Sequence, residues 1–137
     1  MPIPSKFSGR AIKSTTFAGG AGPVTLFTVT GTVIVNVVCV CLVSVTIPGA
    51  ETIEVGTTAA PAVLIAQVLG SNIIAGEIWH DATPDAEIEL SSVVQESIIS
   101  DSNNIVLTQS GNVDTGTLEF YCFWSALSAD GNVVAAA

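Results

Sequence analysis

A charge-free stretch from Val24 to Ile47 limits what this chain can fold into more than any other part of it. The stretch is long enough to cross a bilayer as one helix. However, it is rich in Val and Thr, which are stiff at χ1 and favour strands. From Val33 to Ile47, every odd-numbered position is apolar and the polar residues fall at even positions. This period of two predicts strands at about Val24–Val35 and Val38–Ile47, joined by a bend near Asn36 or continuous as one long bent strand.

Turn residues at regular spacing divide the rest of the chain into short strand-like segments. The clearest is Thr117–Ser125, in which both alternating faces carry aromatic residues, whereas Ala62–Leu69 fits either two helical turns or a strand. About eight or nine such segments predict an all-β fold, a single-domain antiparallel β sandwich or jelly roll. We expect the Gly- and Pro-punctuated residues 1–23 to form an extended N-terminal arm, with Arg10–Phe17 as a candidate edge strand, and residues 24–137 to form the sandwich.

The charges are distributed unevenly along the chain. Its only cations, Lys6, Arg10 and Lys13, precede all 12 acidic residues, and the formal net charge is −9. Affinity for nucleic acid depends on cations that displace counterions, so we expect neither nucleic acid nor an anionic membrane as a partner. A basic segment on an acidic body favours docking of these three cations on an acidic surface of another copy or of a different protein, unless they are simply solvated.

Few charges and many apolar residues indicate that the surface is shared with a partner. Only 11% of the residues are charged and 49% are hydrophobic, which is rich for a free monomer of this size. We therefore expect other copies of the chain, or a larger assembly, to cover much of the surface. Aromatic side chains commonly anchor such interfaces, although they also serve as core residues or line sugar-binding grooves. The candidate interface residues are Trp79, Tyr121, Phe123 and Trp124.

The three cysteines, Cys39, Cys41 and Cys122, all lie in apolar segments. An odd number cannot pair completely within one chain, and a Cys-x-Cys metal site would need further ligands. We expect buried free thiols, which suit folding in a reducing cytoplasm, and no secretory signal peptide is visible.

His80 is the single histidine of the chain, and Glu77, Asp81 and Asp85 lie close to it in the sequence. Such a group is able to hold a metal or relay a proton. A lone His before a Thr-Pro turn more commonly caps its own loop, and no nucleophile-elbow motif is present. We therefore predict no catalytic residue, no cofactor and no metal site, so that the protein is not an enzyme. A small hydrolase or a metal protein is the alternative class.

Five segments resemble a group of small structural proteins from the virions of tailed bacteriophages, and the likeness covers nearly the whole chain. These segments are Ala11–Gly22 (AIKSTTFAGGAG), Val24–Val35 (VTLFTVTGTVIV), Ile53–Thr57 (IEVGT), Ala75–Pro84 (AGEIWHDATP) and Phe120–Ala136 (FYCFWSALSADGNVVAA). Proteins of this group often carry Arg-Pro after the Trp of the last segment, where this chain has Ser125 and Ala126.

The resemblance implies a capsid decoration, or cement, protein. Similar small β proteins sit as homotrimers on the outer face of the phage head and clamp neighbouring subunits of the major capsid protein. Such a protein would be made in the host cytoplasm, and its partners would be itself and the major capsid protein. The alternative is a tail or head-fibre component that binds a host surface, for which we expect an exposed aromatic groove near Trp79 or Trp124.

Overall fold

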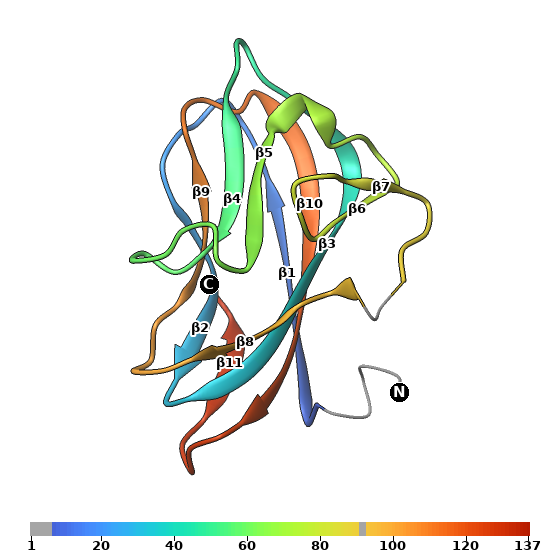
Figure 1. The fold of residues 1–137 in the computed structure, drawn as a ribbon. Coiled ribbons are helices and arrows are strands. Elements are labelled where there is room, and N and C mark those ends of the chain that lie inside the picture. Colours follow the sequence, from blue (N-terminus) through green and yellow to red (C-terminus); the bar gives the residue numbers. More distant parts are fainter. Residues whose placement is uncertain (1–6, 91–92) are drawn as a thin grey trace.

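The computed structural model describes residues 7–90 and 93–137, which form two antiparallel sheets packed face to face (Figure 1). No helix among these residues is long and apolar enough to cross a membrane. The strands are β1 (Gly9–Thr16), β2 (Val24–Thr30), β3 (Val33–Thr46), β4 (Thr52–Gly56), β5 (Ile65–Leu69), β6 (Glu77–Trp79), β7 (Asp85–Ala86), β8 (Glu96–Ile99), β9 (Ile105–Gln109), β10 (Thr115–Ala126) and β11 (Asn132–Ala135). A short 3-10 turn, η2, spans Gly70–Asn72.

The order of the strands is that of a jelly roll. In one sheet β1, β10, β3 and β8 lie side by side, and in the other sheet β2, β9, β4 and β5 do so. Strands β6 and β7 extend the first sheet beside β3, and β11 adds an outer strand beside β2, so the sheets of the described residues have six and five strands. Two such sheets bury their inner sides against each other. The predicted all-β sandwich is confirmed.

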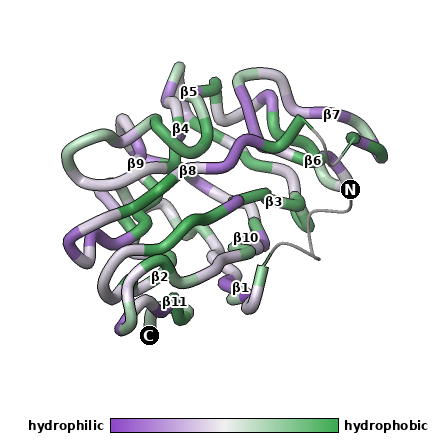
Figure 2. The backbone as a smooth tube through the Cα atoms, turned by 60° about the horizontal axis from the view of Figure 1, so that its bottom comes forward, coloured by the Kyte–Doolittle hydropathy of each residue, from purple (hydrophilic) through white to green (hydrophobic). Residues whose placement is uncertain are grey.

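Strands β3 and β10 form the centre of the six-stranded sheet. Their antiparallel register sets Cys39 opposite Phe120 and Val37 opposite Cys122, and all four side chains are buried between the sheets. The Trp79 ring of β6 packs edge-on against Phe120, with ring centroids 6.2 Å apart. As predicted, the odd-numbered side of β3 faces the core over most of its length. Figure 2 shows these hydrophobic strands in contrast to the hydrophilic loop around β7.

The charge-free stretch departs from its prediction at two points. The break falls at Gly31, between β2 and β3, and the predicted bend near Asn36 is wrong. Gly31 has a φ of 65°, a left-handed conformation that glycine adopts without steric cost, so the chain turns there from one sheet into the other. Val43 is 52% exposed because register shifts around Thr117 interrupt the alternation of β3, which resumes at the buried Val45.

Both ends of the described chain join the sheets. Strand β1 pairs with β10 from Gly9 to Thr16, so the sandwich takes in residues that were assigned to the arm from the sequence. It is an edge strand, as expected for Arg10–Phe17. The ambiguous segment Ala62–Leu69 contributes strand β5. Strand β11, which the sequence did not predict, pairs with β2 near the C-terminus.

The three cysteines are free and buried, as predicted. Burial raises the pKa of the Cys122 thiol to about 12. Burial, helped by the charge of Glu77, raises the pKa of Cys41 to about 11, and burial raises the pKa of Cys39 well above its usual value. A thiol is more easily buried than a thiolate, so these groups behave as small hydrophobic core residues.

Thiol reactivity tests this burial. With a disulfide exchange reagent at pH 8, all three cysteines of the native protein should react far more slowly than they do in denaturant. Each raised pKa means that the folded state favours the thiol over the thiolate, so ionisation of the thiols destabilises the folded protein. The contribution of the buried thiols to the free energy of unfolding is therefore complete below pH 9 and should be lost as the pH rises toward about 11 to 12. Native cysteines that react as fast as a free thiol would contradict the buried arrangement.

Two phenylalanines of β10 make a matched pair for testing the sheet register. The Phe120 ring is fully buried, so Phe120→Ala leaves a cavity and should lower the free energy of unfolding by about 3–5 kcal/mol. Phe123 lies on the opposite, outer side of β10 and is half-buried, so Phe123→Ala should cost less than about half as much. Urea unfolding measures both losses, and equal losses would show that the register is wrong.

Candidate functional site

The outer sides of the two sheets differ in chemistry. The outer side of the five-stranded sheet is polar, with the exposed residues Thr25, Thr28 and Thr30 on β2, and Gln67 of β5 donating a hydrogen bond to Glu54 of β4. The outer side of the six-stranded sheet instead carries large apolar and aromatic side chains that are partly exposed. We call these residues, with the one cation among them, the aromatic face: Phe7, Arg10, Ile12, Val38, Tyr121 and Phe123.

The register of β1, β10 and β3 brings the aromatic face together. Tyr121 lies between Ile12 of β1 and Val38 of β3. Phe123 lies between Arg10 of β1 and Asn36 of β3. Successive side chains of a strand point to opposite sides of the sheet. The residues of β10 that precede Tyr121 and Phe123 are buried in the core, so Tyr121 and Phe123 point outward. Ile12 remains 40% exposed, and no described segment of the chain covers it completely.

A shallow hollow lies at one end of the aromatic face. Phe7, Ser8, Gly9, Arg10 and Phe123 line this hollow, which has a volume of about 310 Å³. The rings of Phe7 and Phe123 lie 6.4 Å apart at an interplanar angle of 38°. The hollow thus combines aromatic surface with an exposed guanidinium group, a pairing that is common at the centre of protein interfaces.

Tyr121 is held in place within the aromatic face. Its hydroxyl donates a short hydrogen bond to the carboxylate of Glu119, which also accepts a hydrogen bond of 3.3 Å from the Ser14 hydroxyl. The bond to Glu119 raises the pKa of Tyr121, because it favours the protonated phenol. The ring therefore presents a fixed surface, and less conformational entropy is lost when a partner covers it.

Asn36 is an unusual buried residue of β3. It lies opposite Phe123 of β10 and Glu96 of β8, and it is 2% exposed. Both polar atoms of its side-chain amide lack a hydrogen-bond partner among the described residues. An unpaired buried amide costs about 1–3 kcal/mol. Because both atoms are buried beneath the surface, Asn36 is not one of the residues that the aromatic face presents to a partner.

The three predicted partner-binding cations have different surroundings. Lys6 lies outside the described residues. Arg10 is exposed on the aromatic face, and its role in binding a partner stays a prediction. Lys13 has an intramolecular partner, because its ammonium group donates a 3.0 Å hydrogen bond to the Ala136 carbonyl, and a partner-binding role for it also stays a prediction. This bond ties β1 to the chain just after β11, which is a structural role.

The two tryptophans do not form an exposed groove. Trp79 is fully buried in the core, so its predicted place at an interface is wrong. The Trp124 ring is partly buried and lies directly over Gly9, where an added Cβ would come within 2.4 Å of the ring. Phe7 and Ile12 were missed from the sequence, although the alternation of β1 beside β10 would have placed Ile12 next to Tyr121 once the pairing was known.

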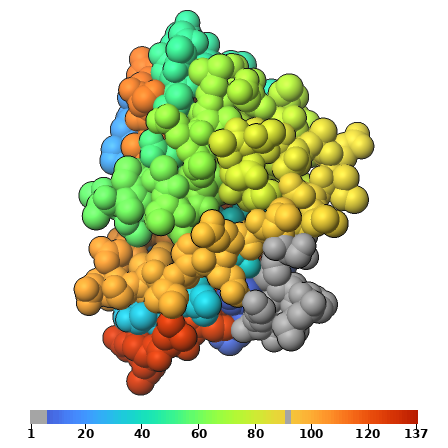
Figure 3. Space-filling model, viewed as in Figure 1, coloured from blue at the N-terminus to red at the C-terminus, as the bar shows by residue number. Residues whose placement is uncertain are grey.

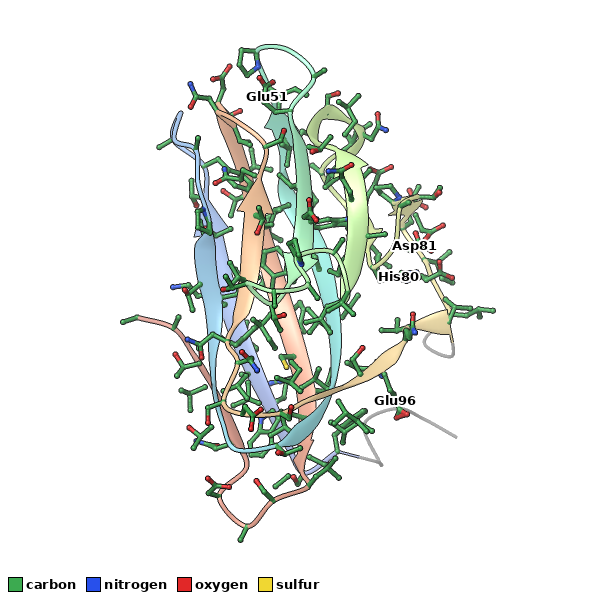
Figure 4. All side chains as sticks on the ribbon, turned by 60° about the vertical axis from the view of Figure 1, so that its left-hand side comes forward. Glu51, His80, Asp81 and Glu96 are labelled. Carbon is green, nitrogen blue, oxygen red and sulfur yellow. The ribbon has the colours of Figure 1, made fainter. Side chains whose placement is uncertain are left out.

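A second polar group surrounds His80, which follows β6. Nε2 of His80 lies 3.0 Å from Glu89 Oε2 and 3.6 Å from Asp85 Oδ2, and Nδ1 lies 3.9 Å from Asp81 Oδ2. Figure 4 shows His80 and Asp81 side by side at the edge of the molecule. The sequence predicted Glu77 in this group, but its carboxylate instead accepts a hydrogen bond from the Ile74 amide.

Glu89 was missed because it lies nine residues beyond His80 and joins it only through the course of the loop. A hydrogen bond shared with Asp85, followed by one with His80, lowers the pKa of the Glu89 carboxyl to about 2. The same interaction with Glu89 raises the pKa of Asp85.

No protein-family model matches the chain, and no curated protein matches it. Its fold is similar to that of a chain in the acidic stable capsid structure of Helicobacter pylori bacteriophage KHP30, with a TM-score of 0.48 and 11% sequence identity. The similarity covers 93% of this chain and 94% of that chain. At this level the likeness concerns the course of the backbone and gives no evidence of function.

The contrast between Lys13 and Arg10 is testable by mutation. Lys13→Met removes the hydrogen bond to the Ala136 carbonyl and should lower the free energy of unfolding by about 1 kcal/mol. Arg10→Met changes an exposed side chain and should alter it by no more than about 0.5 kcal/mol. Urea unfolding of the two variants gives both values, and the reverse order would contradict the structural role of Lys13.

Proposed function

We propose that this protein is a non-enzymatic decoration, or cement, protein of a tailed-bacteriophage capsid. It binds the outer surface of the assembled head as a homotrimer and stabilises contacts between subunits of the major capsid protein. The observation that carries the proposal is the aromatic face, an apolar surface on β1, β10 and β3 that is partly exposed on a strongly acidic jelly roll. Such a surface on a small domain marks an interaction site.

The charge of the protein supports a position outside the capsid shell. A net charge of −9 repels packaged DNA, so an acidic body suits the outer side of the head. The resemblance of five segments to small virion proteins points to the same setting. A protein that binds only the assembled lattice stabilises that lattice by mass action, and a trimer gains further affinity when its three copies bind together.

The jelly-roll fold does not decide between decoration and the alternative, a tail or head-fibre component that binds a host surface. Jelly rolls serve in viral capsids and also in lectins. Sugar-binding by a fibre would need an exposed aromatic groove, whereas Trp79 is buried and Trp124 packs over Gly9. The aromatic face is instead a broad apolar surface with one cation, Arg10, which favours a protein partner.

Binding to phage heads that lack the protein tests the proposal. We expect the protein to sediment with such heads, and Phe123→Asp should weaken this binding at least about 10-fold, because it places a charge in the hollow of the aromatic face. Thr28→Asp adds the same charge to the exposed outer side of the other sheet and should leave binding unchanged. Absence of binding by the unaltered protein, or equal losses in both variants, would overturn the proposal.

The trimer is tested separately by light scattering of the full chain and of a variant lacking residues 1–6, which leaves β1 whole. A trimeric mass for both would assign self-association to the sandwich and leave the first six residues, with Lys6, available for the capsid. A monomeric mass for both, at concentrations well above those of the binding assay, would contradict a trimer in solution.

A further inference from the structure

After β6, three carboxylates converge on the imidazole ring of His80. The His80 side chain is 4% exposed, although it belongs to a loop whose other members are mostly at the surface. Asp85 and Glu89 approach its Nε2 atom, and Asp81 approaches its Nδ1 atom from the other side. The pairing of β6 with β7, which sets Asp85 opposite Ile78, fixes Asp85 relative to the ring.

We propose that His80, Asp85 and Glu89 bind a divalent transition-metal ion such as Zn²⁺, with Asp81 orienting the histidine. Zinc is bound at about 2.0–2.2 Å by histidine nitrogen and carboxylate oxygen, so neighbouring ligand atoms of a tetrahedral site lie about 3.3–3.6 Å apart. The Asp85 oxygen lies 3.6 Å from His80 Nε2, within this range, and the Glu89 oxygen lies slightly closer, at 3.0 Å. A small outward shift of Glu89 would therefore give the spacing of three ligands, and water would take the remaining position.

Two carboxylates are already directed toward the ring by the backbone. One oxygen of Glu89 accepts a 2.7 Å hydrogen bond from the Leu90 amide, which leaves its other oxygen beside Nε2. One oxygen of Asp81 accepts a 2.8 Å hydrogen bond from the Thr83 amide, which leaves its other oxygen beside Nδ1. A carboxylate hydrogen-bonded to the second ring nitrogen is the usual support of a metal-binding histidine, because it fixes the tautomer that leaves Nε2 free to coordinate. At 3.9 Å from Nδ1, the Asp81 oxygen lies just beyond hydrogen-bond distance and would need to move slightly closer to take this role.

The chemistry of the ligands selects the class of metal. Ca²⁺ and Mg²⁺ prefer sites built entirely from oxygen, whereas imidazole suits zinc, copper, iron and nickel. Between Glu77 and Leu90 the chain has five acidic residues and no Lys or Arg, so no cationic side chain of this segment balances the carboxylates. A dication supplies that balance.

The metal would fasten the loop to the sheet. The loop projects from the side of the molecule, as the yellow surface in Figure 3 shows, and it carries the exposed side chains of Ile88 and Leu90. His80 comes directly after β6, so coordination of the metal by His80, Asp85 and Glu89 would tie the later part of the loop to the end of this strand. Binding to the folded state alone stabilises the protein by mass action. This inference does not depend on the capsid function.

Calorimetric titration of the metal-free full chain with Zn²⁺ tests the site. We expect one equivalent to bind and to raise the melting temperature. Glu89→Gln, which removes a ligand, should weaken binding at least about 100-fold, and Asp81→Asn should weaken it about 10-fold. Glu87→Gln is the matched control, because Glu87 is an exposed acid of the same loop and is not one of the three carboxylates beside His80. The affinity of this variant for Zn²⁺ should be unchanged.

Three outcomes would overturn the proposal. No Zn²⁺ binding at millimolar concentration would show that there is no site, and equal losses for Glu87→Gln and Glu89→Gln would show unspecific attraction to an acidic loop. A thiolate-to-metal charge-transfer band on titration with Co²⁺ would assign the metal to the cysteines instead. If His80→Ala does not fold because the ring is buried, Glu89→Gln still decides the question, since Glu89 lies at the surface of the loop and its replacement keeps the shape of the side chain.

Discussion

The register between β3 and β10 is the constraint on which the rest of the structure depends. It sets Cys39 opposite Phe120 in the core and, one residue further along β10, sets Val38 opposite Tyr121 on the outer side. A slip by one residue would bring the Glu119 carboxylate and the Tyr121 hydroxyl into the core and expose the Phe120 ring. Burial of an unpaired carboxylate is prohibitively costly, so the pattern that stabilises the core also fixes the aromatic face.

The fold was largely predictable because the residues of its longest strands alternate clearly in the sequence between the two sides of the sheet. The alternation from Val33 onward and that of Thr117–Ser125 predict the central pair of strands, and the turn residues between the other segments predict a sandwich. The position of the break was not predictable from polarity. Asn36 looks like a bend because it is polar, yet it lies within β3, whereas Gly31 provides the left-handed conformation that the turn needs.

The candidate sites were predicted less well, since their residues meet through contacts that have no local signal. Trp79 belongs to a three-residue strand, too short to show a period, and only its pairing beside Cys39 decides that it faces the core. Lys13 finds its hydrogen-bond partner 123 residues away, near the C-terminus. Glu89 reaches His80 across a loop. Tyr121 and Phe123 lie on one side of a long alternating strand, so the sequence shows that they share a face, and their role at an interface stays a prediction.

The charge distribution limits what the aromatic face can bind. Copies of a chain with a net charge of −9 repel one another, so self-association has to be driven by burial of apolar surface and by pairing of the few cations. Arg10 is the cation on the aromatic face, beside Phe7 and Phe123. A partner surface that covers these rings gains most if it offers a carboxylate to Arg10.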